Sequence, residues 1–244
     1  MALSLSQTVV LGKIIKPTMR VVSLGYPDLV APMQIIEGLL GEKLSWLEYR
    51  ADSEAICKRH GLPLRQIPDA ESCFRLLGCK LDVYDIVRER GCEIILDLNE
   101  PMDVAKQYDI VLDVGTAEHC FNIGQALINM AMMVKEGGYI IHENPFNWGN
   151  HGFYNLNPTL FHDFYTENGF KVEELKLVTR SGLAAEPPPT QRFESPPQEV
   201  NIFCVAKRMR VTAFSYPVQT KYKSLIPAAG DSGGRAANAR AIGE

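Results

Sequence analysis

Three short apolar runs, each ending in an acidic or polar residue, constrain the fold of this chain more than any other feature. The runs cover residues 81–86, 92–98 and 108–115, and their length predicts buried strands. A stretch with apolar residues at helical spacing, 121–134, follows the third run and stops at the glycines 137–138. Strands that alternate with helices in this way predict a parallel sheet.

The acidic ends of these runs predict a ligand site. In an open parallel sheet, ligands bind outside the carboxyl ends of the strands. We therefore expect Asp85, Asp97 and the turn from Gly115 to His119 to line one crevice. A carboxylate after a strand can accept hydrogen bonds from two neighbouring hydroxyls of a nucleoside, although acidic residues also end strands simply because they stay hydrated.

The stretch from residue 108 to 141 carries a family resemblance. Its strand, the Glu118-His119 turn, the helix and the following strand resemble the corresponding part of the class I S-adenosylmethionine (SAM)-dependent methyltransferases, and the likeness extends over residues 19–207. The resemblance implies an α/β fold, a Rossmann-like three-layer sandwich with a mostly parallel seven-stranded sheet whose last strand is antiparallel. It also implies SAM as cofactor.

The same resemblance implies roles for particular residues. Asp85 matches the acid that holds the cofactor ribose, and Asp97 with Leu98 matches the pair beside the adenine. Ser23, Gly25 and Gly115 fall around the rest of the cofactor. The first loop, 21–28, is degenerate because it holds one glycine where the family has several.

Two histidines are candidates for the chemistry of methyl transfer. His119 follows the third acidic run, and His151 lies in a loop, 144–155, rich in Asn, Gly and aromatic residues. A hydroxyl acceptor benefits from a general base with a pKa near neutrality, which imidazole provides. Alternatively, Glu118 and His119 only cap the next helix. His162 and Tyr165, on one face of a later helix, form a second set of candidates.

Composition narrows the partners and the compartment. The 244 residues carry a net charge of −4, which disfavours duplex nucleic acid and favours a small or neutral substrate. The aromatic loop 144–155 suggests a sugar or another ring-shaped acceptor. The six cysteines show no metal-binding spacing, so we expect no metal, no disulfide framework and a cytoplasmic location. No apolar run is long enough for a membrane span. The oligomeric state stays open, a homo-oligomer included.

The rest of the chain predicts the domain organisation. We expect an N-terminal arm or helix (1–18), a methyltransferase-like domain (19–210) with a helical insertion (41–78), and an extension that ends in a disordered tail (211–244). Further helices are expected at 33–40, 48–60, 68–77 and 157–168, and further strands at 19–25, 139–142, 170–179 and 199–207.

Two functions follow from this sequence. The first is a SAM-dependent methyltransferase acting by O-methyl transfer on a small hydroxylated acceptor, a sugar or another metabolite. The second is a methyltransferase-like binding or scaffold protein without catalysis, in a glycan or metabolite assembly pathway. The first loop distinguishes them, because Tyr26 either leaves the space of the donor free or fills it.

Overall fold

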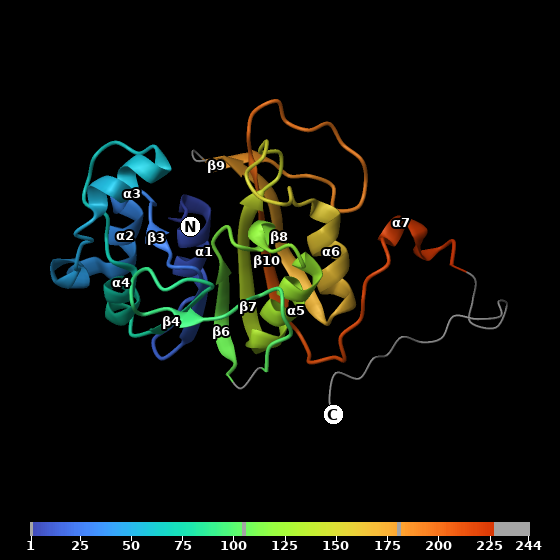
Figure 1. Cartoon of the computed structure of the whole chain (residues 1–244), viewed down its shortest axis with the longest axis horizontal. Coiled ribbons are helices and arrows are strands. Elements are labelled where there is room, and N and C mark those ends of the chain that lie inside the picture. Colours follow the sequence, from blue (N-terminus) through green and yellow to red (C-terminus); the bar gives the residue numbers. More distant parts are fainter. Residues whose placement is uncertain (1, 104–105, 180–181, 227–244) are drawn as a thin grey trace.

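The computed structural model describes residues 2–103, 106–179 and 182–226. Its centre is an eight-stranded sheet with the strand order β5-β4-β2-β6-β7-β10-β8-β9 (Figure 1). The strands of this sheet are β2 (Arg20–Leu24), β4 (Lys80–Asp85), β5 (Ile94–Ile95), β6 (Tyr108–Asp113), β7 (Val134–Pro145), β8 (Phe170–Thr179), β9 (Gly182–Ala185) and β10 (Asn201–Arg208).

The strand directions confirm the mixed sheet expected from the sequence. Strands β5, β4, β2, β6 and β7 run parallel, and β10 is antiparallel to both of its neighbours, β7 and β8. Only the count differs: β9 adds an eighth strand at the edge, antiparallel to β8. Because β2 lies between β4 and β6, the chain reverses its direction of travel across the sheet there, and such a switch point is where open α/β sheets bind ligands.

Helices cover both faces of the sheet. In Figure 1 the helices α1 to α4 gather on one side of the molecule and α5 and α6 on the other. A short helix, α7, lies near the C-terminal end of the described residues. The bounds are α1 (Leu5–Ile14), α2 (Met33–Leu40), α3 (Ser53–His60), α4 (Ala70–Leu76), α5 (Ile123–Met133), α6 (Pro158–Glu167) and α7 (Thr220–Lys223), with 3₁₀ helices η1 (Gly41–Trp46) and η2 (Ala117–His119).

The central strands are buried on both faces, which explains their continuous apolar sequences. Successive side chains of a strand point to opposite faces. In β6, Ile110 and Leu112 pack in one apolar cluster with residues of α1, α2 and α4, whereas Val111 packs in the other with residues of α5 and α6. Two cores therefore hold one sheet between two helical layers.

Several elements differ from the sequence prediction at their ends. The helix expected at 48–60 begins only at Ser53, because Tyr49 pairs with Pro68 in an isolated bridge. The strand expected at 92–98 is reduced to Ile94–Ile95 at the edge of the sheet. Helix α5 ends at Met133, and β7 already begins at Val134 rather than after the two glycines.

The N-terminal segment is packed against the sheet. A two-residue strand, β1 (Ala2–Leu3), pairs with β3 (Asp28–Leu29), and α1 follows it. Gln7 is fully buried and donates a hydrogen bond to the backbone oxygen of Asp113 at the end of β6 (3.1 Å). The domain boundaries expected from the sequence remain predictions, and the tail from residue 227 lies outside the described residues.

All six cysteines are free, and Cys92 is the only one that is not buried. In the part of the chain that the structure describes, no helix has the length and apolarity needed to cross a bilayer.

Candidate functional site

A pocket opens where β4, β5 and β6 end. It encloses about 460 Å³, counted with the solvent space at its mouth. Three of the residues predicted around the cofactor, Asp85, Asp97 and Leu98, line it, and so does His119. The full lining consists of Tyr84, Asp85, Ile86, Leu96, Asp97, Leu98, Asn99, Thr116, His119 and Cys120.

The pocket combines carboxylates with apolar side chains. The register of β4 and β5, with the Leu96 amide donating to the Asp85 carbonyl (2.9 Å), places the two acidic ends side by side. Ile86, Leu96 and Leu98 add apolar surface. This donor and acceptor set fits a nucleoside, because carboxylates accept hydrogen bonds from ribose hydroxyls and apolar walls suit a flat base.

Asp97 lines the pocket and also forms hydrogen bonds with a neighbouring residue of the lining. Its Oδ1 accepts hydrogen bonds from the backbone amide (2.9 Å) and the side-chain amide (2.7 Å) of Asn99. Asn99 in turn accepts a bond from the amide of Asn122, which precedes α5 (2.9 Å). Asn99 is thus a site residue that the sequence prediction missed.

Two polar groups of the first loop form hydrogen bonds within the protein. Gly25 has a positive φ of 84° and donates its amide hydrogen to the carbonyl of Tyr84 (2.6 Å), and the hydroxyl of Ser23 donates to the carbonyl of Gly25 (2.7 Å). Neither residue lines the pocket. Gly115 is also outside the lining, which its neighbour Thr116 provides instead. The cofactor roles predicted for Ser23, Gly25 and Gly115 remain predictions.

Tyr26 does not fill the pocket. Its ring is buried, with the guanidinium groups of Arg50 and Arg90 at 5.1 and 5.3 Å from the ring centre, and its hydroxyl donates to Asp69 (2.6 Å). Burial and this bond to a carboxylate raise the pKa of Tyr26 well above its usual value. The side chain therefore packs against the segment 41–78, through Arg50 and Asp69, and against Arg90.

A fully buried polar network lies behind the third strand end. The Asp113 carboxylate contacts the His142 ring (2.7 Å) and accepts a bond from Asn144 (2.8 Å), and His142 contacts the hydroxyl of Tyr165 (2.5 Å). Asp113 also accepts the backbone amides of Thr116 (2.9 Å) and Ala117 (3.2 Å). Those two bonds form the turn η2.

Glu118 is the buried residue of η2, with 1% of its surface exposed. Its Oε2 accepts a hydrogen bond from Asn144 (2.9 Å), whereas Oε1 has no hydrogen-bond partner among the described residues. Burial, and then the charge of Asp113, raise the pKa of Glu118 to about 7. A sequence shows an acidic residue beside His119 but not that it is buried, so Glu118 was missed as a site residue.

His119 and His151 lie together over Glu118. Their Nε2 atoms are 3.9 and 3.6 Å from Oε1 of Glu118, and their ring centres are 5.4 Å apart. Burial, and then the neighbouring His151, lower the pKa of His119. The structure therefore unites the two histidines predicted from separate parts of the sequence.

The loop that carries His151 is attached to η2. The amides of Phe153 and Tyr154 donate to the carbonyl of Glu118 (2.9 and 3.3 Å). Gly152 approaches so closely that a β-carbon there would lie 2.9 Å from that same carbonyl oxygen. This contact, between positions more than thirty residues apart, brings His151 to Glu118.

The second set of predicted candidates lies elsewhere. His162 contacts Asp163 (2.8 Å) on α6, and Tyr165 is fully buried in the network with His142. Neither lines the pocket.

Comparisons with known proteins give fold likeness only. No protein-family model matches the sequence, and no curated protein matches it. A 1,6-didemethyltoxoflavin-N1-methyltransferase from Burkholderia thailandensis is 13% identical, with a TM-score of 0.46 over 83% of this chain and 76% of that one. TehB from Haemophilus influenzae is 11% identical, with a TM-score of 0.41 over 83% of this chain and 62% of that one.

The fold is assigned from the topology of the chain itself. The sheet has five parallel strands, a switch point beside β2 and an antiparallel β10 between β7 and β8. An acidic residue follows or ends each strand that borders the pocket. The chain thus has a Rossmann-like three-layer α/β fold with a mostly parallel sheet, the fold that the resemblance of the sequence implied.

Proposed function

We propose that this protein binds SAM in the pocket at the ends of β4, β5 and β6 and methylates a small hydroxylated acceptor, a sugar or another metabolite. The observation that carries the proposal is the lining of that pocket, in which Asp85 and Asp97 face apolar residues at the switch point of the sheet. When bound, SAM supplies an electrophilic methyl group on a sulfonium.

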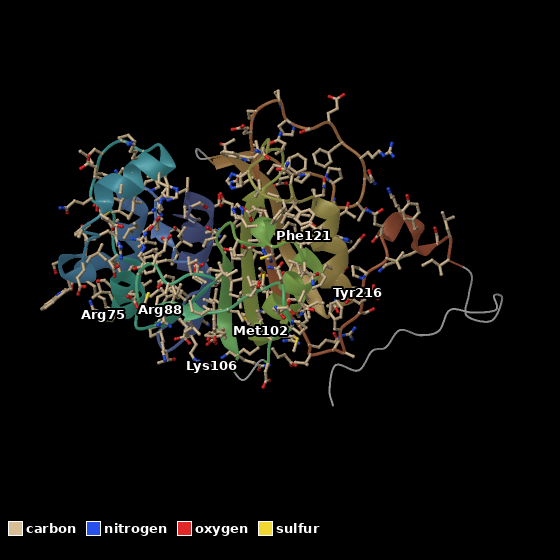
Figure 2. The ribbon with its side chains drawn as sticks, in the orientation of Figure 1. Arg75, Arg88, Met102, Lys106, Phe121 and Tyr216 are labelled. Atoms are coloured by element: carbon tan, nitrogen blue, oxygen red, sulfur yellow. The ribbon has the colours of Figure 1, made fainter. Side chains whose placement is uncertain are left out.

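His119 supports an acceptor position next to this pocket. It lines the pocket and also contacts His151, so a hydroxyl between them would lie within reach of an imidazole that takes up its proton. Phe121 and Phe153 lie close in sequence to the two histidines, are mostly exposed and meet edge to face, with ring centres 5.6 Å apart. Phe121, which precedes α5 in the chain, is labelled in Figure 2. These rings offer apolar surface to an acceptor.

The compartment and partners belong to the same proposal. Free cysteines fit a reducing cytoplasm. The net charge of −4 supports a small-molecule substrate over duplex nucleic acid.

A binding or scaffold protein without catalysis is the second candidate. It is favoured by one observation, that the amide of Gly25 and the hydroxyl of Ser23 are already hydrogen-bonded within the protein. Such a protein would bind neither SAM nor its demethylated product.

Calorimetric titration with SAM and with S-adenosylhomocysteine tests the donor site. We expect both to bind, and Asp85→Ala to weaken binding by about 1.5–3 kcal/mol because it removes hydrogen bonds to a charged acceptor. Asp103→Ala is the matched control, because Asp103 is exposed and does not line the pocket. No heat with either compound would refute the donor site, and unchanged affinity in Asp85→Ala would refute only the ribose role.

A further inference from the structure

Glu118, His119 and His151 place one carboxylate oxygen and two imidazole nitrogens within 4.8 Å of one another. The oxygen that faces the nitrogens is Oε1 of Glu118, at 3.9 Å from Nε2 of His119 and 3.6 Å from Nε2 of His151. Two histidines and a carboxylate are a common set of metal ligands in proteins. The sequence has no metal-binding motif at these positions, because Glu118 and His119 lie in the turn η2 and His151 lies in a distant loop.

The hydrogen bonding of Glu118 points to a ligand independently of these distances. A buried carboxylate oxygen without a hydrogen-bond partner costs about 1–3 kcal/mol or more. Oε1 of Glu118 is such an atom, although Oε2 of the same side chain is bonded to Asn144. The orphaned oxygen is the one that points to the histidines.

Neighbouring residues hold the three side chains in this arrangement. Asp113 fixes the turn η2 by accepting two of its amides, and Asn144 bonds both Asp113 and Glu118. The loop at Gly152 is joined to the same turn by two backbone hydrogen bonds to the Glu118 carbonyl. Metal ligands in proteins are typically oriented by such outer hydrogen bonds.

We propose that Glu118, His119 and His151 bind one divalent transition-metal ion, with zinc as the best-fitting ion. With metal bonds of about 2.0–2.1 Å, the ligand atoms of a tetrahedral zinc ion lie about 3.4 Å apart. The two observed oxygen–nitrogen distances, 3.6 and 3.9 Å, are close to this value, and all three ligand atoms lie within 4.8 Å of one another. The side chains of His151 and His119 are 43% and 50% exposed, so they have room to close around an ion. Magnesium and calcium are disfavoured because they prefer oxygen ligands.

Three protein ligands leave a coordination position open. His119 also lines the donor pocket, so that position borders it. This part of the inference rests on the proposed function: an acceptor hydroxyl bound to the ion would be held beside the donor, and its pKa would fall. His119 and His151 would then act as ligands of the ion rather than as bases.

The test is metal titration of the full chain after treatment with EDTA and dialysis. We expect one equivalent of zinc to bind by calorimetry and to be retained in elemental analysis, with magnesium at least 100-fold weaker. Glu118→Gln and His151→Ala should each weaken zinc binding by about 10–100-fold or more. Thermal unfolding shows whether each variant is folded, and His151→Ala, at an exposed position, keeps the test valid if Glu118→Gln fails to fold.

Two control variants exclude other zinc ligands. His162→Ala changes a histidine outside the cluster, and Cys92→Ser removes the one cysteine that is not buried. Both should bind zinc like the unmodified protein. Absence of zinc binding, or equal affinity in His151→Ala and the unmodified protein, would overturn the proposal.

The metal site and the donor site can fail separately. Zinc is titrated without SAM or S-adenosylhomocysteine, and S-adenosylhomocysteine is titrated into the metal-free protein. Zinc binding without nucleoside binding would keep the metal site and refute the proposed methyltransferase. The reverse result would refute the metal site alone and return His119 and His151 to the role of candidate bases.

Discussion

At the scale of single residues, Asp113 organises the site without facing the pocket. Burial favours its neutral form, but hydrogen bonding to His142, and then to Asn144, outweighs burial and holds the pKa of Asp113 below its usual range. Its two oxygens together form hydrogen bonds with the ring of His142, the side-chain amide of Asn144 and the backbone amides of Thr116 and Ala117. The ionised carboxylate, which only accepts hydrogen bonds, is the form that satisfies these partners.

Replacing this carboxylate by an amide should destabilise the fold. In Asp113→Asn one acceptor oxygen becomes an NH₂ donor, which must face either the amides of Thr116 and Ala117 or the Asn144 amide. We expect the free energy of unfolding to fall by about 3 kcal/mol, measured by urea denaturation. The exposed Asp103→Asn serves as control. A loss below about 1 kcal/mol would contradict the role given to Asp113.

At the scale of elements, a polar cluster joins the segment 41–78 to the first loop. Asp52, at the start of α3, bonds Arg50 (3.0 Å) and Arg90, and both arginines pack on Tyr26. Asp28 of β3 contacts His60 (3.1 Å) and Arg90 (3.4 Å). Side chains of the first loop thus attach the segment 41–78 to the sheet.

Acid should weaken this attachment. Slight burial opposes ionisation of Asp52, but hydrogen bonds from Arg50 and Arg90 outweigh it and lower the pKa of Asp52 to about 2. Because the unfolded value is about 3.9, the folded state binds fewer protons between these values. The stabilisation is therefore complete above about pH 5 and disappears as the pH falls towards 2.

The measurement compares the unmodified protein with Asp52→Asn by urea denaturation from about pH 7 to about pH 3. The difference in free energy of unfolding should be constant at the upper end and shrink at the lower end. It should stay below about 1 kcal/mol, because 38% of the Asp52 side chain is exposed to water. If the difference in free energy of unfolding grew in acid, the ionised form of Asp52 would not be the form that stabilises the fold.

The loop 146–155 allows a matched test of packing. A β-carbon at Gly152 would lie 2.9 Å from the Glu118 carbonyl oxygen and 3.1 Å from Nδ1 of His119, whereas one at Gly149 would meet nothing within 4 Å. Gly152→Ala should therefore move the loop, cost about 1–3 kcal/mol of stability and weaken zinc binding at least tenfold. Gly149→Ala should change neither quantity. Equal behaviour of the two variants in denaturation and zinc titration would contradict the packing role of Gly152.

At the scale of the whole molecule, the parts of the candidate site lie at one end of the sheet, the end where the parallel strands have their carboxyl termini. The pocket lies where β4 and β6 end, the turn η2 follows β6, and the start of the N-terminal helix α1 reaches the ends of β6 and β7. There the side chain of Ser4 donates to Glu143 of β7, and Gln7 reaches the end of β6. Helices pack on the two faces of the sheet and bury the strands, whereas the pocket opens at this end of the sheet.

A ligand bound at that end should stabilise the whole fold. At a concentration 100 times its Kd, S-adenosylhomocysteine adds about 2.7 kcal/mol to the free energy of unfolding. For a domain of this size that raises Tm by about 5–11 °C. A thermal scan checks this, with Asp85→Ala at the same ligand concentration as comparison, where the rise should be smaller. An unchanged Tm in the unmodified protein would count against the donor site.

The elements with strong local patterns could be predicted from the sequence. Helix α2 and strand β8 have the predicted bounds, since helical or alternating apolar spacing and flanking prolines or glycines act within a few residues. Strand β5 is shorter than its apolar run, and β9 was not predicted, because edge strands depend on their pairing partners. The same local patterns predicted Asp85, Asp97 and His119 at one crevice, whereas Leu98 was expected there only from the family resemblance; all four line the pocket.

The sequence by itself placed Asp85, Asp97 and the turn after β6 near the carboxyl ends of neighbouring parallel strands, because strand periodicity is local and these ends meet at one edge of the sheet. Only the tertiary structure decided that Tyr26 turns towards Arg50 and Arg90 and that Glu118 is buried beneath two histidines. Both outcomes depend on contacts between segments far apart in the chain, above all the approach of Gly152 to η2. Such contacts follow from the packing of complete elements and leave no periodic signal in the sequence.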